Sequence, residues 1–312
     1  MEAYQEIDLE YAKHTGSKFA VSCSSGTAAL HLSLLALGVG KGDEVIVPDF
    51  SMAACAFAVS YVNARPVFVD VLADTYALDP AKLEKAITKK TKAIIVVHTY
   101  GRLADMNAIT KIARKHKISV IEDACEAQGA VFNSKADLTV YSFYRNKIIR
   151  AEEGGMITTN KKSYVDTINY LKSMAFGPKH DYFHKHVGYN YRLANAEAKL
   201  ALESLKAFPA NNKKRREIES WYDQYLTNPM SKRDAVWFYE VRVSQKAKAA
   251  ILKAVSSARD CFKPLSSFPM YGSKKGQPVS LALSKELLLL PANPELTELE
   301  VKKICELVNT YV

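Results

Sequence analysis

The stretch YSFYRNKIIRAEEGGMITT, residues 141–159, decides how the rest of the chain is interpreted. An aromatic-rich strand is predicted to end at Phe143, and a charged turn that carries Lys147 follows it. The pair Gly154–Gly155 then leads into another β-rich run. A lysine in a turn is most often a solvated surface residue. Whether Lys147 has a function therefore depends on what the other segments place beside it.

Short apolar segments rich in Val and Ile recur before this stretch. They are nearly continuous in apolar character, which is typical of strands buried on both faces of a parallel sheet. Helical segments lie between them, and this alternation implies βαβ units with right-handed crossovers. The predicted strands are residues 43–48, 65–70, 92–98, 118–124 and 138–143, and the predicted helices are residues 27–38, 51–62, 79–88 and 105–117. The sequence thus predicts an α/β fold with a mostly parallel sheet.

The pattern changes after residue 160, where longer helical segments replace the strand–helix alternation. The predicted elements there are helices at 163–176, 195–208, 212–226, 247–258 and 295–312, with a β-containing patch at 235–244. We therefore predict a large α/β domain at residues 1–205 and a smaller α/β domain at residues 206–312.

Composition favours a globular protein with anionic partners. The chain has 312 residues, is 48% hydrophobic and carries a formal net charge of +10. Such a charge suits phosphorylated small molecules or nucleic acid. The excess is dispersed, however, and its densest cluster, Lys213–Arg216, is typical of an exposed helix face. We expect no nucleic-acid binding.

Cysteine spacing and hydropathy limit the classes of protein to which the chain can belong. The five cysteines are odd in number and form no CxxC pair, which indicates neither a disulfide framework nor a metal site. The first 18 residues are polar and contain no apolar signal-peptide core. No apolar run approaches membrane-spanning length. We expect a cytoplasmic protein with no membrane partner.

Several chemically active side chains fall at one edge of the predicted sheet, where ligands bind in open parallel sheets. Gly26 and Thr27 begin a long helix, whose free N–H groups suit a phosphate; a plain N-cap is the alternative. Asp123 ends an apolar strand and needs a partner, which is either a helix cap or a cationic ligand group. Ser142 and Lys147 follow the next strand.

Taken together, these residues form the set that pyridoxal 5′-phosphate (PLP) requires. The amine of Lys147 would form a Schiff base with the aldehyde. The carboxylate of Asp123 would keep the pyridine nitrogen protonated, which makes the ring an electron sink. The helix N-terminus and nearby hydroxyls would hold the phosphate.

Ordered motifs along nearly the whole chain resemble those of the DegT/DnrJ/EryC1/StrS family of PLP-dependent sugar aminotransferases, closest to its perosamine-synthase-like group. The resemblance implies fold type I, the aspartate aminotransferase-like fold. The motifs that carry it are SCSSGTAALHLSLLALGVGKGDEVIVPDF (22–50), VIEDACEAQGA (120–130), YSFYRNKIIRAEEGGMITT (141–159), HVGYNYRLANAEAKLAL (186–202) and ARDCFKPLSSFPMY (258–271).

The resemblance also implies roles for individual residues. Lys147 matches the Schiff-base lysine and Asp123 the aspartate at the pyridine nitrogen. Asn190 matches an asparagine that reaches the cofactor phosphate of a neighbouring subunit, which implies a homodimer with shared active sites. The other implied cofactor contacts are Gly26, Thr27 and Ser142 at the phosphate, Gln128 near the phenolic oxygen and Met52 against the ring, where an ordinary core methionine is the alternative. Arg192 and Arg259 occupy positions that meet an anionic substrate, although structural salt bridges explain them equally well.

By the same resemblance, a lysine at position 147 favours amino transfer over the related sugar dehydratases, which have histidine there. The implied reaction moves an amino group from glutamate to C4 of a nucleotide-diphospho 4-keto-6-deoxy sugar, for surface polysaccharide synthesis. The family's usual N-terminal arm has no counterpart before FAVSCSSGT, so we expect a more open pocket or another element that closes it. A shortened, non-catalytic regulatory or scaffold protein and a PLP-dependent sugar dehydratase or lyase remain the alternatives.

Overall fold

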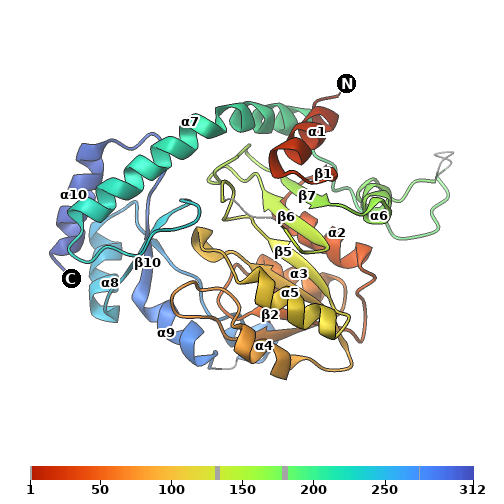
Figure 1. Ribbon diagram of the computed structural model, residues 1–312, viewed down its shortest axis with the longest axis horizontal. Helices are drawn as coiled ribbons and strands as arrows, with labels where there is room; N and C mark the ends of the chain where they lie inside the picture. Colours follow the sequence, from red (N-terminus) through yellow and green to blue (C-terminus); the bar gives the residue numbers. More distant parts are fainter. Residues whose placement is uncertain (1, 131–133, 178–181, 274) are drawn as a thin grey trace.

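The computed structural model describes residues 2–130, 134–177, 182–273 and 275–312 (Figure 1). The helices are α1 (Ala3–Thr15), α2 (Gly26–Ala36), α3 (Ala54–Tyr61), α4 (Pro80–Ala86), α5 (Met106–Lys115), α6 (Lys162–Lys172), α7 (Asn195–Tyr225), α8 (Gln245–Ala254), α9 (Pro278–Glu286) and α10 (Glu298–Asn309). In the described part of the chain, none of them is both long and apolar enough to cross a bilayer.

A seven-stranded sheet organises the N-terminal part, with the strand order β1-β7-β6-β5-β4-β2-β3. Strands β3, β2, β4, β5 and β6 run parallel, and β7 pairs antiparallel with both β6 and β1. The strands are β1 (Phe19–Cys23), β2 (Glu44–Pro48), β3 (Arg65–Val69), β4 (Thr91–Val97), β5 (Ser119–Asp123), β6 (Leu138–Ser142) and β7 (Gly155–Thr159). The mostly parallel sheet and the five predicted strands are confirmed.

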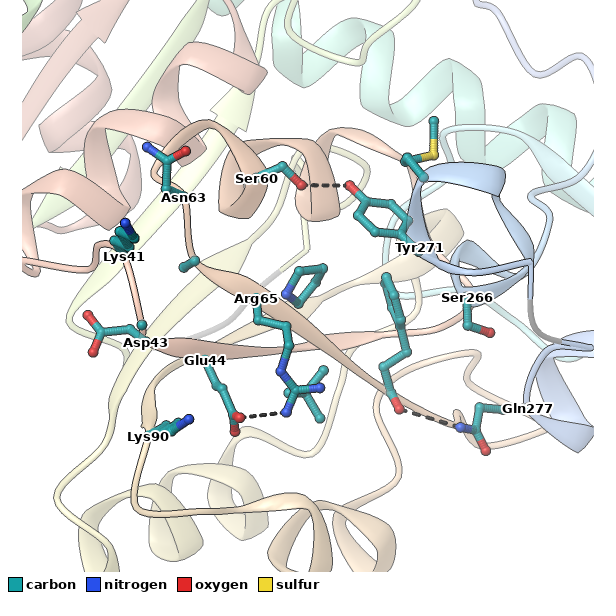
Figure 2. A pocket seen from close by; sticks show the side chains of 16 residues that line it. Lys41, Asp43, Glu44, Ser60, Asn63, Arg65, Lys90, Ser266, Tyr271 and Gln277 are labelled. Atoms are coloured by element: carbon teal, nitrogen blue, oxygen red, sulfur yellow. Dashed lines mark hydrogen bonds and ion pairs between the residues drawn. The ribbon is translucent and has the colours of Figure 1, made fainter.

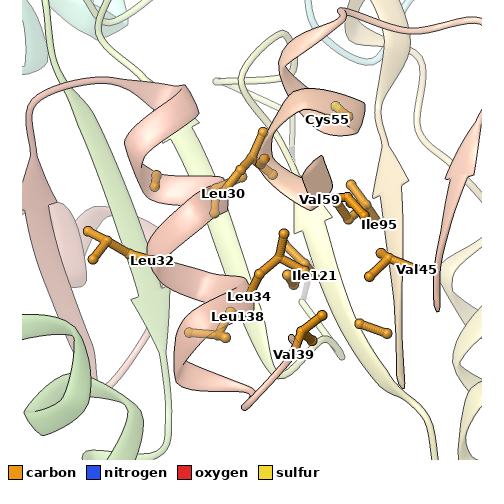
Figure 3. Close-up of a cluster of buried hydrophobic side chains, with 14 of the residues drawn as sticks. Leu30, Leu32, Leu34, Val39, Val45, Cys55, Val59, Ile95, Ile121 and Leu138 are labelled. Atoms are coloured by element: carbon orange, nitrogen blue, oxygen red, sulfur yellow. The ribbon is translucent and has the colours of Figure 1, made fainter. Parts of the chain in front are cut away.

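Both faces of this sheet are buried, because alternate residues of each strand enter different cores. Val45 and Ile95 pack with α2 and α3 on one face, as the side chains in Figure 3 show. Ile46 and Ile94, their neighbours in the chain, pack with α4 and α5 on the other face. Two-sided burial explains why the strands read as continuous apolar runs rather than as alternating ones.

The C-terminal part has its own core around a three-stranded antiparallel sheet with the order β8-β10-β9. Its strands are β8 (Tyr239–Arg242), β9 (Arg259–Asp260) and β10 (Leu287–Leu290). A further buried cluster joins the two parts, since it contains Phe50 and Tyr100 of the first together with Trp237 and Leu289 of the second.

Helix α7 links the two parts without a break (Figure 1). Two helices were predicted here, at 195–208 and 212–226, because Pro209 lies between them. The structure has one helix of 31 residues that contains Pro209. Its first half packs on α1 and its second half on α10. The predicted boundary at 205/206 falls inside α7, and we keep it as a proposal for where one core gives way to the other.

Helix α6 ends at Lys172, whereas the sequence predicted a helix to residue 176. Met174 and Ala175 have φ values of 65° and 52°, so the backbone turns into the left-handed region there. That conformation cannot continue an α-helix.

Candidate active site

A cavity of about 450 Å³ lies at the carboxyl ends of β5 and β6, beside the N-terminus of α2. This is the edge at which open parallel sheets bind ligands. The structure brings together here the predicted site residues Gly26, Thr27, Met52, Asp123, Ser142, Lys147 and Arg259. The C-terminal part contributes an aromatic section of the wall, through Trp237, Phe238 and Phe262.

The N-terminus of α2 forms one end of the cavity. The hydroxyl of Ser25 accepts a hydrogen bond from the Ala28 N–H at 3.0 Å and so caps the helix. A Cβ on Gly26 would lie 3.0 Å from the Ser142 Cβ and 3.2 Å from the Cys125 Sγ. Glycine therefore lets the backbone come close to β6. The first N–H groups of a helix have no partner within it, so this end suits a phosphate.

Asp123 ends β5, and its side chain is buried. One carboxylate oxygen accepts from the Cys125 N–H at 3.0 Å, and the other accepts from the Cys55 thiol at 3.3 Å. Burial, followed by the charge of Asp123, raises the pKa of both thiols well above the usual value. The two cysteines thus stay protonated, and a cationic ligand group can pair with the carboxylate.

Lys147 is buried rather than solvated, with 9% of its surface exposed. Its Nζ lies 3.6 Å from the centre of the Trp237 ring and 3.9 Å from Oε1 of Glu126. The Trp237 Nε1 donates to the backbone oxygen of Asn146 at 2.8 Å, which fixes the ring against the turn. A cation over an indole face is attracted by the ring, and burial makes that attraction stronger.

Glu126 is a cavity residue that the sequence reasoning missed. Its side chain is buried, and Oε2 accepts from the Tyr100 N–H at 2.9 Å. Burial raises the pKa of Glu126 to about 7, although the nearby charge of Lys147 opposes the shift. The signal that was available is its position three residues after Asp123, in the loop that leaves the same strand.

Gln128, which was expected near the cofactor's phenolic oxygen, does not line this cavity. Its side-chain amide donates to the Ser142 backbone oxygen at 3.0 Å, and its Oε1 accepts from the Ile149 N–H at 2.9 Å. Both ends of the amide therefore brace the backbone that carries Ser142 and Lys147. The structure gives Gln128 a supporting position, and its contact with the cofactor's phenolic oxygen stays a prediction.

Asn190 and Arg192 also lie outside the cavity of their own chain. Both are exposed, and the Arg192 Nη2 donates to Oδ1 of Asn190 at 3.1 Å. They follow α6 on the segment that leads into α7. A contact of either residue with a second subunit stays a prediction.

A larger hollow, of about 1020 Å³, lies elsewhere, at the free edge of β3 (Figure 2). In its wall, Glu44 pairs with Arg65 at 2.5 Å and accepts from Thr88 at 2.7 Å. None of the predicted cofactor residues lines it. Size alone is therefore a poor guide, and the smaller cavity that contains Lys147 and Asp123 is the candidate active site.

The residues around Lys147 fit PLP. The cavity is of a size for a small cofactor, and it has a primary amine, a carboxylate and a helix N-terminus on its walls. The close approach at Gly26 leaves room for a phosphate where a larger residue would meet Ser142. This set can hold an aldehyde carbon, a ring nitrogen and a phosphate at once.

Comparison with known proteins gives matches over the whole chain. The sequence model of the DegT/DnrJ/EryC1/StrS aminotransferase family matches residues 2–309. A GDP-perosamine synthase of Caulobacter vibrioides is 36% identical, over 96% of this chain and 87% of the relative. A dTDP-3-amino-3,6-dideoxy-alpha-D-galactopyranose transaminase of Aneurinibacillus thermoaerophilus is 32% identical, over 98% and 89%. The putative sugar aminotransferase Spr1654 from Streptococcus pneumoniae, in its PMP form, superimposes with a TM-score of 0.93 at 26% identity, over 100% and 90%.

Proposed function

Because the chain belongs to the DegT/DnrJ/EryC1/StrS aminotransferase family, we propose that it moves an amino group from glutamate to C4 of a nucleotide-linked 4-keto-6-deoxy sugar of the perosamine type. The cofactor is PLP, as the relatives with PLP and PMP forms indicate. The observation that carries the proposal is the buried amine of Lys147 in one cavity with Asp123 and the N-terminus of α2.

When bound, PLP supplies a ring that takes up the electrons released at the substrate carbon. The chain's own residues then have separate tasks. Lys147 attaches the cofactor through its amine, and once that amine is free its Nζ moves a proton to and from the substrate carbon. Asp123 holds the proton on the ring nitrogen, because a buried carboxylate favours a positively charged partner.

Glu126 and Trp237 set the environment of the Lys147 amine. Its positive charge faces the indole ring on one side and the carboxyl group of Glu126 on the other. Trp237, Phe238 and Phe262 also form an aromatic wall that keeps water from the reacting carbon. We propose that the sugar enters past this wall, and that Asn190 of a second copy completes the phosphate site in a homodimer.

The absorption spectrum of the purified protein with PLP tests this function. We expect a visible band that Lys147→Ala abolishes and that glutamate bleaches. Lys246→Ala is the matched control, because Lys246 is an exposed lysine on α8 and lies outside the cavity. Amination of GDP-, UDP- and dTDP-linked 4-keto-6-deoxy sugars by the bleached enzyme then identifies the acceptor.

Two results would contradict the proposal. A visible band that does not depend on Lys147 would remove the lysine from the reaction. A band that glutamate leaves unchanged, with sugar nucleotides that lose water instead of gaining an amine, would favour the dehydratase alternative.

A further inference from the structure

A second hollow, of about 440 Å³, adjoins the candidate active site and shares part of its wall. The residues that line both are Asn146, Trp237, Phe238 and Arg259. Four arginines line the second hollow, with Glu295 as the carboxylate among its lining residues. We call it the arginine hollow, defined by Arg145, Arg150, Arg215 and Arg259.

The arginines converge from three parts of the chain. Arg145 and Arg150 stand on either side of Lys147 on the turn between β6 and β7. Arg215 comes from α7, and Arg259 begins β9 in the C-terminal sheet. The fold therefore ties this concentration of positive charge directly to the turn that carries the reactive lysine.

The positive charge of the hollow is not balanced within the described part of the chain. Arg150 pairs with Glu295 at 2.9 Å. No carboxylate of the described residues lies within ion-pair distance of Arg145, Arg215 or Arg259. Like charges around one concave site repel each other, and low-dielectric walls strengthen that effect. An anion that enters the hollow would relieve the repulsion.

Arg215 adds a largely buried guanidinium to the wall of this hollow. It is 2% exposed, and its Nη1 donates to the backbone oxygens of Trp237 and Ala292 at 3.1 and 2.8 Å. Its buried Nε, however, has no hydrogen-bond partner among the described residues. Burial, together with the charge of Arg150, lowers the pKa of Arg215 to about 10. An unpaired buried donor is costly, which is why such groups normally have a partner.

We propose that the arginine hollow binds the diphosphate group of the nucleotide sugar. The inference rests on the proposed function and adds to it a subsite for the charged part of the acceptor. Planar guanidinium groups match phosphate oxygens with paired hydrogen bonds. The shared wall lets the keto carbon stay at Lys147 while the diphosphate occupies the adjoining hollow. A carboxylate of glutamate has the same kind of charge, so the test must separate the two sources.

The test measures binding by the PLP-loaded enzyme. The chain has two tryptophans, and Trp221→Phe leaves Trp237, which lines both hollows, as the reporter. GDP, UDP or dTDP is added stepwise to the Trp221→Phe protein, and the change in Trp237 fluorescence gives the affinity of each nucleotide. Arg145→Gln and Arg150→Gln are then compared in the same background. Arg242→Gln is the matched control, because Arg242 is an arginine on the surface of β8 that pairs with Glu286.

We expect each of the two hollow variants to weaken the best-bound nucleotide about tenfold, which corresponds to one lost charge-assisted hydrogen bond. The salt dependence of binding should also become less steep. Guanosine, which lacks the diphosphate, should bind the variants and the parent alike. Glu295→Gln should act in the opposite direction and tighten binding about threefold, because it removes the carboxylate that competes for Arg150.

Three results would overturn the proposal. If Arg145→Gln and Arg150→Gln bind the nucleotides as tightly as the Arg242→Gln control does, the hollow is not used. A loss of affinity shared by guanosine would mean a general disturbance of the pocket. If Arg145→Gln and Arg150→Gln weaken the bleaching by glutamate more than they weaken nucleotide binding, the hollow is a carboxylate site. The visible band of the Lys147-bound cofactor is followed in the same samples, so a failure of the proposed function is seen separately from a failure of this subsite.

Discussion

Replacing Glu126 by glutamine should make the protein more stable at neutral pH and leave it unchanged in acid. Glu126 is buried beside Lys147, and burial raises its pKa from 4.5 to about 7. Glutamine keeps the shape of the side chain and an oxygen that can accept from the Tyr100 N–H. It removes only the titration, so the effect of the charge can be isolated.

The size and sign of the effect follow from proton linkage. The native carboxyl holds its proton up to about pH 7, whereas the unfolded carboxyl loses it near pH 4.5. Between these values the native state binds more protons, so the free energy of unfolding of the parent falls as pH rises. At about 1.4 kcal/mol per pH unit, the total loss is about 3 kcal/mol, complete above pH 7. The glutamine variant does not titrate there and avoids this loss.

Urea unfolding of the cofactor-free proteins between pH 4 and pH 8 measures the effect. The difference in unfolding free energy between Glu126→Gln and the parent should be near zero at pH 4 and about 3 kcal/mol at pH 8, in favour of the variant. Glu203→Gln, at an exposed glutamate on α7, is the control for a generic loss of charge. A difference that does not change across this pH range would refute the assignment of a raised pKa to Glu126.

Three further substitutions test other parts of the site and fold. Asp123→Asn should abolish glutamate bleaching while the visible band persists, measured by absorbance, because an amide cannot hold the ring-nitrogen proton as a carboxylate does. Gly155→Ala should cost about 3 kcal/mol in urea unfolding, since its Cβ would meet the backbone carbon and oxygen of Ser25 at 2.4 Å; unchanged stability would contradict this contact. Glu240→Gln should destabilise the protein by about 3 kcal/mol, because Glu240 pairs with the buried guanidinium groups of both Arg102 and Arg233; a double variant with Arg233→Met should recover only part of that loss, since Arg102 still lacks its partner.

The sequence predicted the parallel strands well because their burial leaves a strong local signal. Strands β2 and β4 are apolar at nearly every position, and the structure buries both of their faces. Strand β10, which was not predicted, consists of four leucines directly after α9. A run of leucine has no period and favours a helix at least as much as a strand. Pairing with β8 and β9, which no local pattern reveals, decides its conformation.

In the candidate site too, the residues with a local sequence signal were predicted and the others were not. Lys147, Asp123 and the start of α2 were predicted because each follows a recognisable strand or begins a helix. Glu126 was missed, because nothing in its neighbourhood distinguishes it from a surface glutamate until the loop is folded inward. The arginine hollow depends on Arg215, about 70 residues beyond Lys147 in the chain. Sequence patterns report local periodicity and cannot report which distant cations converge.

The environment of Lys147 requires both parts of the protein to be folded. The indole that contacts its amine belongs to the C-terminal part, and the Trp237 Nε1 holds the backbone of Asn146 at 2.8 Å. Just before Trp237 in the chain, the Ala235 N–H donates to the Gly101 oxygen at 2.9 Å, and a Cβ on Gly101 would lie 1.9 Å from the Ala235 oxygen. This close contact fixes the position of the C-terminal part on the N-terminal part at Gly101. The C-terminal part is therefore a wall of the active site as well as a separate core, and a fragment that ends at residue 205 would expose Lys147 to water and lose the raised pKa of Glu126.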